Sequence, residues 1–141
     1  MKKYILLIIS WLLATYIPAQ QSRYFFTSEE LSSGLITCIT QDKTGLVWVG
    51  TEYGLNKYDG YRFTNYLYTG GKPGSLPSNN ITSLFSDNQG NLWVGTSDGL
   101  VLYDDENDQF EYIELPTPRH PRINDIIQED ENHILLGTAG Y

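Results

Sequence analysis

The sequence predicts an all-β fold, a partial β-propeller made of four-stranded antiparallel blades. The stretch 36–59 returns as 81–104 with about half of the aligned positions identical, at a period of about 45 residues that is typical of propeller blades. Each copy consists of short apolar segments separated by turn residues, without a helical period. A third copy begins at Ile123 and loses much of the pattern, so we expect two full repeats plus an incomplete third.

Within the first repeat, turn chemistry divides the chain into four strands. Asp42 begins a tight turn that Gly45 completes, because Asp bonds its own backbone and Gly readily takes a positive φ. Gly54 introduces the third strand, and Asp59-Gly60 is typical of a two-residue hairpin. The predicted strands are therefore 36–41, 46–51, 55–58 and 61–66.

Several residues recur because the blade needs them. The tryptophan lies two residues before Gly-Thr in mid-strand, and we interpret it as packing between blades rather than as a ligand platform. The aspartate is interpreted as a turn former rather than as a catalytic acid. The predicted structural positions are Asp42, Gly45, Trp48, Gly50 and Gly54 in the first repeat, and Asp87, Gly90, Trp93, Gly95 and Gly99 in the second.

The first segment is predicted to be a secretory signal peptide, residues 1–19. Lys2 and Lys3 precede a short apolar run, and Ala19 provides a small residue before the chain turns polar. The run is shorter than the ~20 apolar residues of a spanning helix, although a retained N-terminal anchor is the alternative. We expect cleavage after Ala19 and therefore an exported chain.

The rest of the chain divides at polar Pro/Gly loops. Tyr24-Phe25-Phe26 resembles an isolated strand of the kind that closes a propeller ring. The expected units are 20–35, an N-terminal strand and entry loop; 36–68, the first blade; 69–80, an inter-blade loop; 81–115, the second blade; and 116–141, a loop and an incomplete third blade.

Composition excludes several function classes. The formal net charge of -8 provides no footprint for nucleic acid, whose phosphates require clustered Lys and Arg. The single cysteine, Cys38, lies in an apolar run and is read as a buried thiol. His120 and His133 have no spacing that indicates a metal site or a triad. We therefore expect no catalytic residue, no metal and no cofactor.

The repeated pattern Asp-x-x-Gly-x-x-Trp-Val-Gly-Thr-x-x-Gly-Leu, preceded by Ile-Thr and followed by Tyr-Asp, resembles the two-component regulator propeller repeat. The resemblance covers roughly residues 22–141. It implies the periplasmic sensor region of a hybrid two-component histidine kinase, which often detects glycan fragments. It also implies further blades, an inner-membrane anchor and a kinase as partners, in a phosphorelay to which this segment contributes no catalysis.

Recognition is expected on the turns between the second and third strands. These turns vary inside an otherwise repeated frame, and variable loops on a rigid scaffold commonly carry recognition. The candidate ligand-binding residues are Glu52, Tyr53, Ser97 and Asp98, with an oligosaccharide as the expected ligand. Two alternatives remain open: a secreted propeller enzyme acting on polysaccharide, and a structural or partner-binding propeller. Variation without any function also remains open at these turns.

Overall fold

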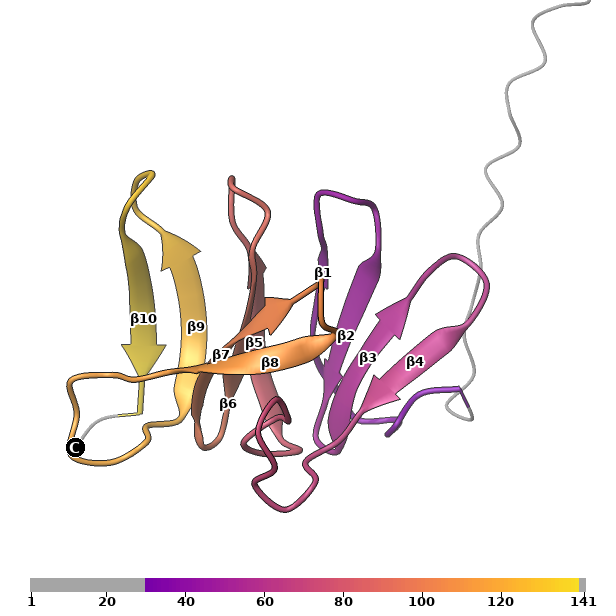
Figure 1. Cartoon of the computed structure of the whole chain (residues 1–141), viewed down its shortest axis with the longest axis horizontal. Helices are drawn as coiled ribbons and strands as arrows, with labels where there is room; N and C mark the ends of the chain where they lie inside the picture. The colour runs from indigo at the N-terminus through magenta and orange to yellow at the C-terminus, as the bar shows by residue number, and fades with distance from the viewer. Residues whose placement is uncertain (1–29, 140–141) are drawn as a thin grey trace, which may run out of the picture.

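The structure, a computed structural model, describes residues 30–139 and contains three antiparallel sheets placed side by side (Figure 1). The predicted signal peptide and the Tyr24-Phe25-Phe26 segment lie outside the described residues. The first blade contains β1 (Ile36–Gln41), β2 (Val47–Thr51), β3 (Gly54–Tyr58) and β4 (Phe63–Tyr66). The second contains β5 (Ile81–Ser86), β6 (Leu92–Thr96), β7 (Gly99–Asp104) and β8 (Gln109–Ile113), and the third sheet pairs β9 (Ile123–Gln128) with β10 (Ile134–Thr138).

The two four-stranded sheets run in the order β1-β2-β3-β4 and β5-β6-β7-β8, so the prediction of an all-β chain with four-stranded antiparallel blades is confirmed. Sequence neighbours pair through short turns, as a meander requires. In Figure 1 the turns after β1, β5 and β9 lie at the upper edge, whereas the inter-blade connections lie at the lower edge. Residues 30–139 form strands and loops, and no helix among them is long and apolar enough to cross a membrane.

The core lies between the blades. Trp48 and Leu55 on one face of the first blade are fully buried against Val94, Val101 and Tyr103 of the second. The rings of Trp48 and Tyr103 meet edge to face with centroids 4.7 Å apart. The second blade repeats this arrangement, because Leu100 packs against Ile123 and Ile126 of β9. Each blade therefore buries one face against the next.

The recurrent Gly-Thr and Ile-Thr dipeptides allow adjacent blades to approach closely. A Cβ at Gly50 would lie 2.7 Å from Cγ2 of Ile81, so only glycine leaves room for the innermost strand of the next blade. Gly95 meets Ile123 in the same way, at 2.9 Å. Thr37 Oγ1 donates to the Ile81 carbonyl at 2.7 Å and joins β1 to β5. These contacts explain why both blades have a glycine in the Gly-Thr dipeptide and a hydroxyl residue in the Ile-Thr dipeptide, where each blade meets the next.

A polar cluster joins the outer strands of the two blades. Lys57 Nζ donates to Tyr103 Oη at 2.7 Å and to Asp108 Oδ1 at 3.1 Å, and it lies over the rings of Trp48, Tyr66 and Tyr103. The hydroxyls of Tyr66 and Tyr103 donate to Asp108 at 2.6 and 2.5 Å. These hydroxyl donors, helped by Lys57, lower the pKa of Asp108 to about 2 although burial opposes the shift. The cluster therefore holds an ionised carboxylate at near-neutral pH.

The turn between β3 and β4 differs from the expected two-residue hairpin. Tyr58 pairs with Phe63, so the loop has four residues rather than two. Asp59 Oδ1 accepts the amides of Tyr61 and Arg62 at 2.8 and 2.9 Å, and these bonds stabilise the wider loop. The prediction of a strand from Tyr61 is therefore wrong by two residues.

The third copy pairs its two strands although it lacks the turn Asp, the turn Gly and the Trp of the repeat. The Glu129 amide donates to the His133 carbonyl at 3.0 Å, as the Asp87 amide does to the Asn91 carbonyl. Asp130, one position later, accepts the Asn132 amide at 2.8 Å and so takes over part of the role of the missing turn aspartate.

Candidate functional site

Buried threonines build the turns that present the candidate residues. Thr51 Oγ1 donates to the Gly54 carbonyl at 2.9 Å and accepts the Tyr53 amide at 3.1 Å. Thr96 makes the same two contacts in the second blade, at 2.9 Å with Gly99 and 3.0 Å with the Asp98 amide. Both threonines are fully buried, so each turn is fixed to its blade by two hydrogen bonds that are shielded from water. Sequence reasoning missed this role of the Thr in Gly-Thr, which the repeat itself could have indicated.

The turns between β2 and β3 and between β6 and β7 lie at the lower edge of adjacent blades in Figure 1, next to the inter-blade connections. They contain the candidate residues Glu52, Tyr53, Ser97 and Asp98. Glu52, Tyr53 and Asp98 are exposed, with 59% of Tyr53 accessible, and Ser97 is half-buried. The structure thus places both turns on one face. Within residues 30–139, no hydrogen bond or ion pair joins the turn at 52–53 directly to the turn at 97–98.

The inter-blade loops hold this face in place. The Gly54 amide donates to the Asn79 carbonyl at 2.7 Å, and the Gly99 amide donates to the Pro121 carbonyl at 3.0 Å. Ser97 Oγ lies 2.8 Å from the hydroxyl of Ser78. His120 Nδ1 lies 3.9 Å from Asp98 Oδ1, so the loop before the third sheet extends the face beside Asp98. The sequence shows no metal-site or triad spacing for His120, and the structure places this residue beside Asp98.

The repeated aspartates are engaged in hydrogen bonds rather than free for catalysis. Asp42 accepts the amides of Thr44 and Leu46 at 2.9 and 3.1 Å and the indole N–H of Trp48 at 2.7 Å. Burial raises the pKa of the Asp42 carboxyl, but these hydrogen bonds outweigh it and leave the pKa lowered. A general acid would need a raised pKa, so this environment favours a structural role.

Asp87 has the same surroundings in the second blade. It accepts the amides of Gly90 and Asn91 at 2.7 and 2.8 Å and the indole N–H of Trp93 at 2.9 Å. Its pKa is also lowered, because hydrogen bonds led by that of Trp93 outweigh burial. The aspartate and the tryptophan six residues later are therefore one hydrogen-bonded unit, a link that the turn interpretation did not include. Across residues 30–139, no group of three His, Cys, Asp or Glu residues could hold a metal.

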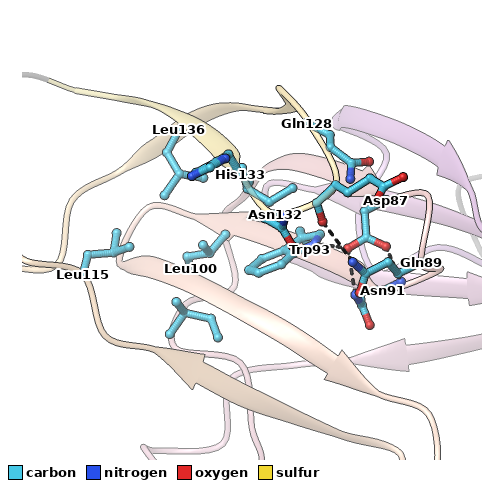
Figure 2. A pocket seen from close by; sticks show the side chains of 13 residues that line it. Asp87, Gln89, Asn91, Trp93, Leu100, Leu115, Gln128, Asn132, His133 and Leu136 are labelled. Atoms are coloured by element: carbon cyan, nitrogen blue, oxygen red, sulfur yellow. Dashed lines mark hydrogen bonds between the residues drawn. The ribbon is translucent and has the colours of Figure 1, made fainter.

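A cavity of about 460 Å³ opens beside Trp93 (Figure 2). Trp93, Leu100 and Leu115 form its apolar part, and Asp87 and Asn91 contribute polar groups. The corresponding surface at Trp48 is covered by β7 and β8, whereas β9 and β10 leave Trp93 half-buried. The cavity is therefore the uncovered counterpart of the packing surface between the first two blades, and we do not assign it as the ligand site.

Comparison with known proteins matches this architecture. The family model described as "Two component regulator propeller" matches residues 30–53 and 75–98, one segment at the entry to each blade. The chain carries two-component regulator propeller repeats. These propeller repeats include the Asp–Trp units, the buried threonines and the turns 52–53 and 97–98 described above.

One curated sequence and one solved structure are similar to this chain. Over 58 residues, 38% of this chain, the sequence is 45% identical to "Histidine kinase P4" of Formosa agariphila. The structure resembles the extracellular domain of a protein described as a hybrid two-component system of B. thetaiotaomicron, with a TM-score of 0.64, 26% identity and 80% of this chain covered. The chain spans 4% of the length of the kinase and 17% of that solved chain.

Proposed function

We propose that this segment is the exported, ligand-sensing part of a hybrid two-component sensor and that it binds a glycan fragment without transforming it. The observation that carries the proposal is the pair of propeller repeats, which present different residues on otherwise equivalent turns. A related domain is extracellular, and a related sequence is a histidine kinase, which supports a sensory role. Location in the periplasm and coupling to a membrane-anchored kinase are parts of the same proposal.

The proposed contacts to the ligand come from Glu52, Tyr53, Ser97 and Asp98. The exposed ring of Tyr53 offers a flat face for a sugar ring, and the carboxylates accept hydrogen bonds from hydroxyl groups. The turns are held by buried threonines, so little conformational entropy is lost when a ligand binds. The acidic character of the face disfavours anionic ligands and favours neutral, hydroxyl-rich ones.

The enzyme alternative has weaker support. The repeated acids Asp42 and Asp87 accept several hydrogen bonds each and have lowered pKa values, which suits neither a general acid nor a base near neutral pH. The purely structural alternative predicts that the turns 52–53 and 97–98 tolerate any polar substitution without a change in binding.

The proposal is tested by titrating the full chain with neutral oligosaccharides, such as β-glucan, xylan and arabinan fragments, in a calorimeter. We expect binding without cleavage products, and about a tenfold or larger loss of affinity when Glu52, Tyr53, Ser97 and Asp98 are all replaced with Ala. Tyr61→Ala is the matched control, because Tyr61 is 95% exposed on the opposite turn edge. Cleavage of a glycan, or unchanged affinity in the fourfold variant, would contradict the proposal.

A further inference from the structure

A small pocket lies where the end of β8 meets the connection to β9. Its volume is about 90 Å³, and its lining includes Tyr112, Glu114, Leu115, Thr117, Pro118 and His120. The connection runs along the lower edge of Figure 1, the edge that also carries the turn 97–98. The pocket therefore opens on the face where we expect recognition.

Contacts bring this pocket against the turn of the second blade. His120 Nδ1 lies 3.9 Å from Asp98 Oδ1, and the His120 ring packs on the Tyr112 ring with centroids 4.9 Å apart. A Cβ at Gly99 would lie 3.0 Å from Cε2 of Tyr112, so the tyrosine ring lies directly against the turn. Three separate segments, the turn, β8 and the connection, thus meet around Asp98.

The first blade carries different residues at the equivalent positions. The strand register makes Tyr112 the counterpart of Asn65, and it makes Glu114 the counterpart of Leu67. The Asn65 side chain donates a hydrogen bond within its own blade, at 3.1 Å. The blade fold therefore does not require a tyrosine and a glutamate here, and the second blade uses them to line a pocket.

The pocket offers hydrogen-bond acceptors, a donor and an apolar surface. The ionised Glu114 carboxylate only accepts hydrogen bonds. The Thr117 hydroxyl donates to the Arg119 carbonyl at 2.8 Å, so its lone pairs remain as acceptors for a ligand. His120 can carry a donor N–H at Nε2, because the distance of 3.9 Å to Asp98 is too long to fix the tautomer by a hydrogen bond. Leu115 and the neighbouring Pro118 provide the apolar part.

Size and charge narrow the class of ligand. A volume of 90 Å³ equals about three water molecules at ~30 Å³ each, so the pocket admits a substituent rather than a whole sugar ring. The carboxylates of Glu114 and Asp98 would repel an acidic substituent such as a carboxylate or a sulfate. A hydroxyl group alone would leave the apolar surface without contact. A secondary amide with a methyl group matches all three kinds of lining.

We propose that this pocket binds the acetamido group of a 2-acetamido sugar, so that the sensed ligand is an N-acetylated glycan. The inference rests on the proposed function, because the sugar ring itself would lie against the turn 97–98. The amide N–H donates to Glu114, the amide carbonyl accepts from His120 Nε2, and the methyl group contacts Leu115. Tyr112 is a positioning residue, since its ring holds the imidazole beside the turn.

The test compares triacetylchitotriose with cellotriose, which has a hydroxyl group in place of each acetamido group. Calorimetric titration of the full chain should show about tenfold tighter binding of triacetylchitotriose. Glu114→Ala combined with His120→Ala should abolish this preference and leave the affinity for cellotriose unchanged. Both residues are exposed, so the variant should fold, which circular dichroism checks. Arg119→Ala is the matched control, because Arg119 is an exposed neighbour outside the pocket lining and its loss should keep the preference.

A second variant separates this inference from the proposed function. Glu52 and Tyr53 lie in the first blade and outside the pocket, so replacing both with Ala should weaken both trisaccharides equally and leave their ratio intact. Equal affinities in the unmodified chain, no binding of triacetylchitotriose, or a preference that persists in the folded pocket variant would each refute the acetamido site. Cellotriose binding that still depends on Glu52 and Tyr53 would in those cases leave the proposed function standing.

Discussion

Replacing Trp48 with Ala should destabilise the protein much more than the same change at Trp93, although the two residues occupy equivalent positions. Trp48 is fully buried, and its ring contacts Tyr103 at 4.7 Å and Tyr66 at 6.0 Å between centroids. Trp93 has the same indole bond, to Asp87, but it borders the open cavity. Comparing the two variants therefore shows whether burial, rather than position in the repeat, determines the loss of stability.

The magnitude follows from what each truncation removes. Trp48→Ala creates a cavity in a closed core and loses its aromatic contacts, so we expect a cost of about 4 kcal/mol, within the usual range for buried aromatic residues. Trp93 already contacts solvent and has no aromatic cover from the third sheet, so about 2 kcal/mol is expected. Both changes also leave an aspartate without its indole donor, and this contribution cancels in the comparison.

Urea unfolding followed by far-UV circular dichroism measures both costs. A difference of about 2 kcal/mol corresponds to about 1 M in the unfolding midpoint at a typical slope. Trp48→Phe and Trp93→Phe are the controls: each keeps an aromatic ring but loses the N–H donor and part of the ring volume, so the difference between their costs should be smaller than that between the two Ala variants. Equal losses for the two Ala variants would refute the reasoning, because burial would then not set the cost.

Two further predictions concern pH and close packing. The pKa of Asp108 is lowered to about 2, so its ionised form adds stability above the unfolded pKa near 4, and this stability is lost as the pH falls from 4 to 2. Asp108→Asn should flatten the pH dependence of the melting temperature in that window, and an unchanged profile would contradict the assignment. Gly50→Ala should cost about 1–3 kcal/mol because its Cβ would lie 2.5 Å from Cys38 Sγ and 2.7 Å from Ile81 Cγ2. Gly137→Ala, with its nearest neighbour at 3.4 Å, should cost little in the same urea assay.

The repeat made most of the fold predictable. Turn residues such as Asp42 and Gly45 set where strands end, and the Gly at φ +92 confirms the conformation that the turn needs. The four-residue loop at Asp59 was not predictable from Asp-Gly, because the Asp side chain can accept amides two and three residues ahead instead of closing a two-residue hairpin. The Asp-Gly sequence is therefore compatible with both a two-residue hairpin and a four-residue loop.

The hydrogen bond between Asp42 and Trp48 was missed for a different reason. Each residue had a sufficient explanation by itself, as turn former and as packing residue, and only their strand geometry shows that they meet at 2.7 Å. The third sheet shows the reverse case, because β9 and β10 pair although the Asp, Gly and Trp of the repeat are gone. Apolar alternation, with Ile126 and Leu136 facing the second blade, is enough to fix that pairing.

Differences between the two blades fall into two groups. Asn56 replaces the Val101 of the second blade in a fully buried position, where it accepts the Ser32 amide at 2.8 Å and donates to the Val49 carbonyl at 2.9 Å. Lys57 replaces Leu102 and finds its own partners in the polar cluster. Such differences are compensated within the fold and need no outside ligand.

The differences at the lower edge have no such compensation. Leu35 and Leu67 stand exposed where the second blade has Asn80 and Glu114, and Tyr53 stands exposed where it has Asp98. An apolar side chain held in water contributes nothing to folding at a site where a polar residue serves the same backbone. In a repeat protein, positions that differ between repeats and are not satisfied internally are therefore the candidates for contact with a partner. By this criterion the face that carries these turns, rather than the cavity at Trp93, is where binding should be sought.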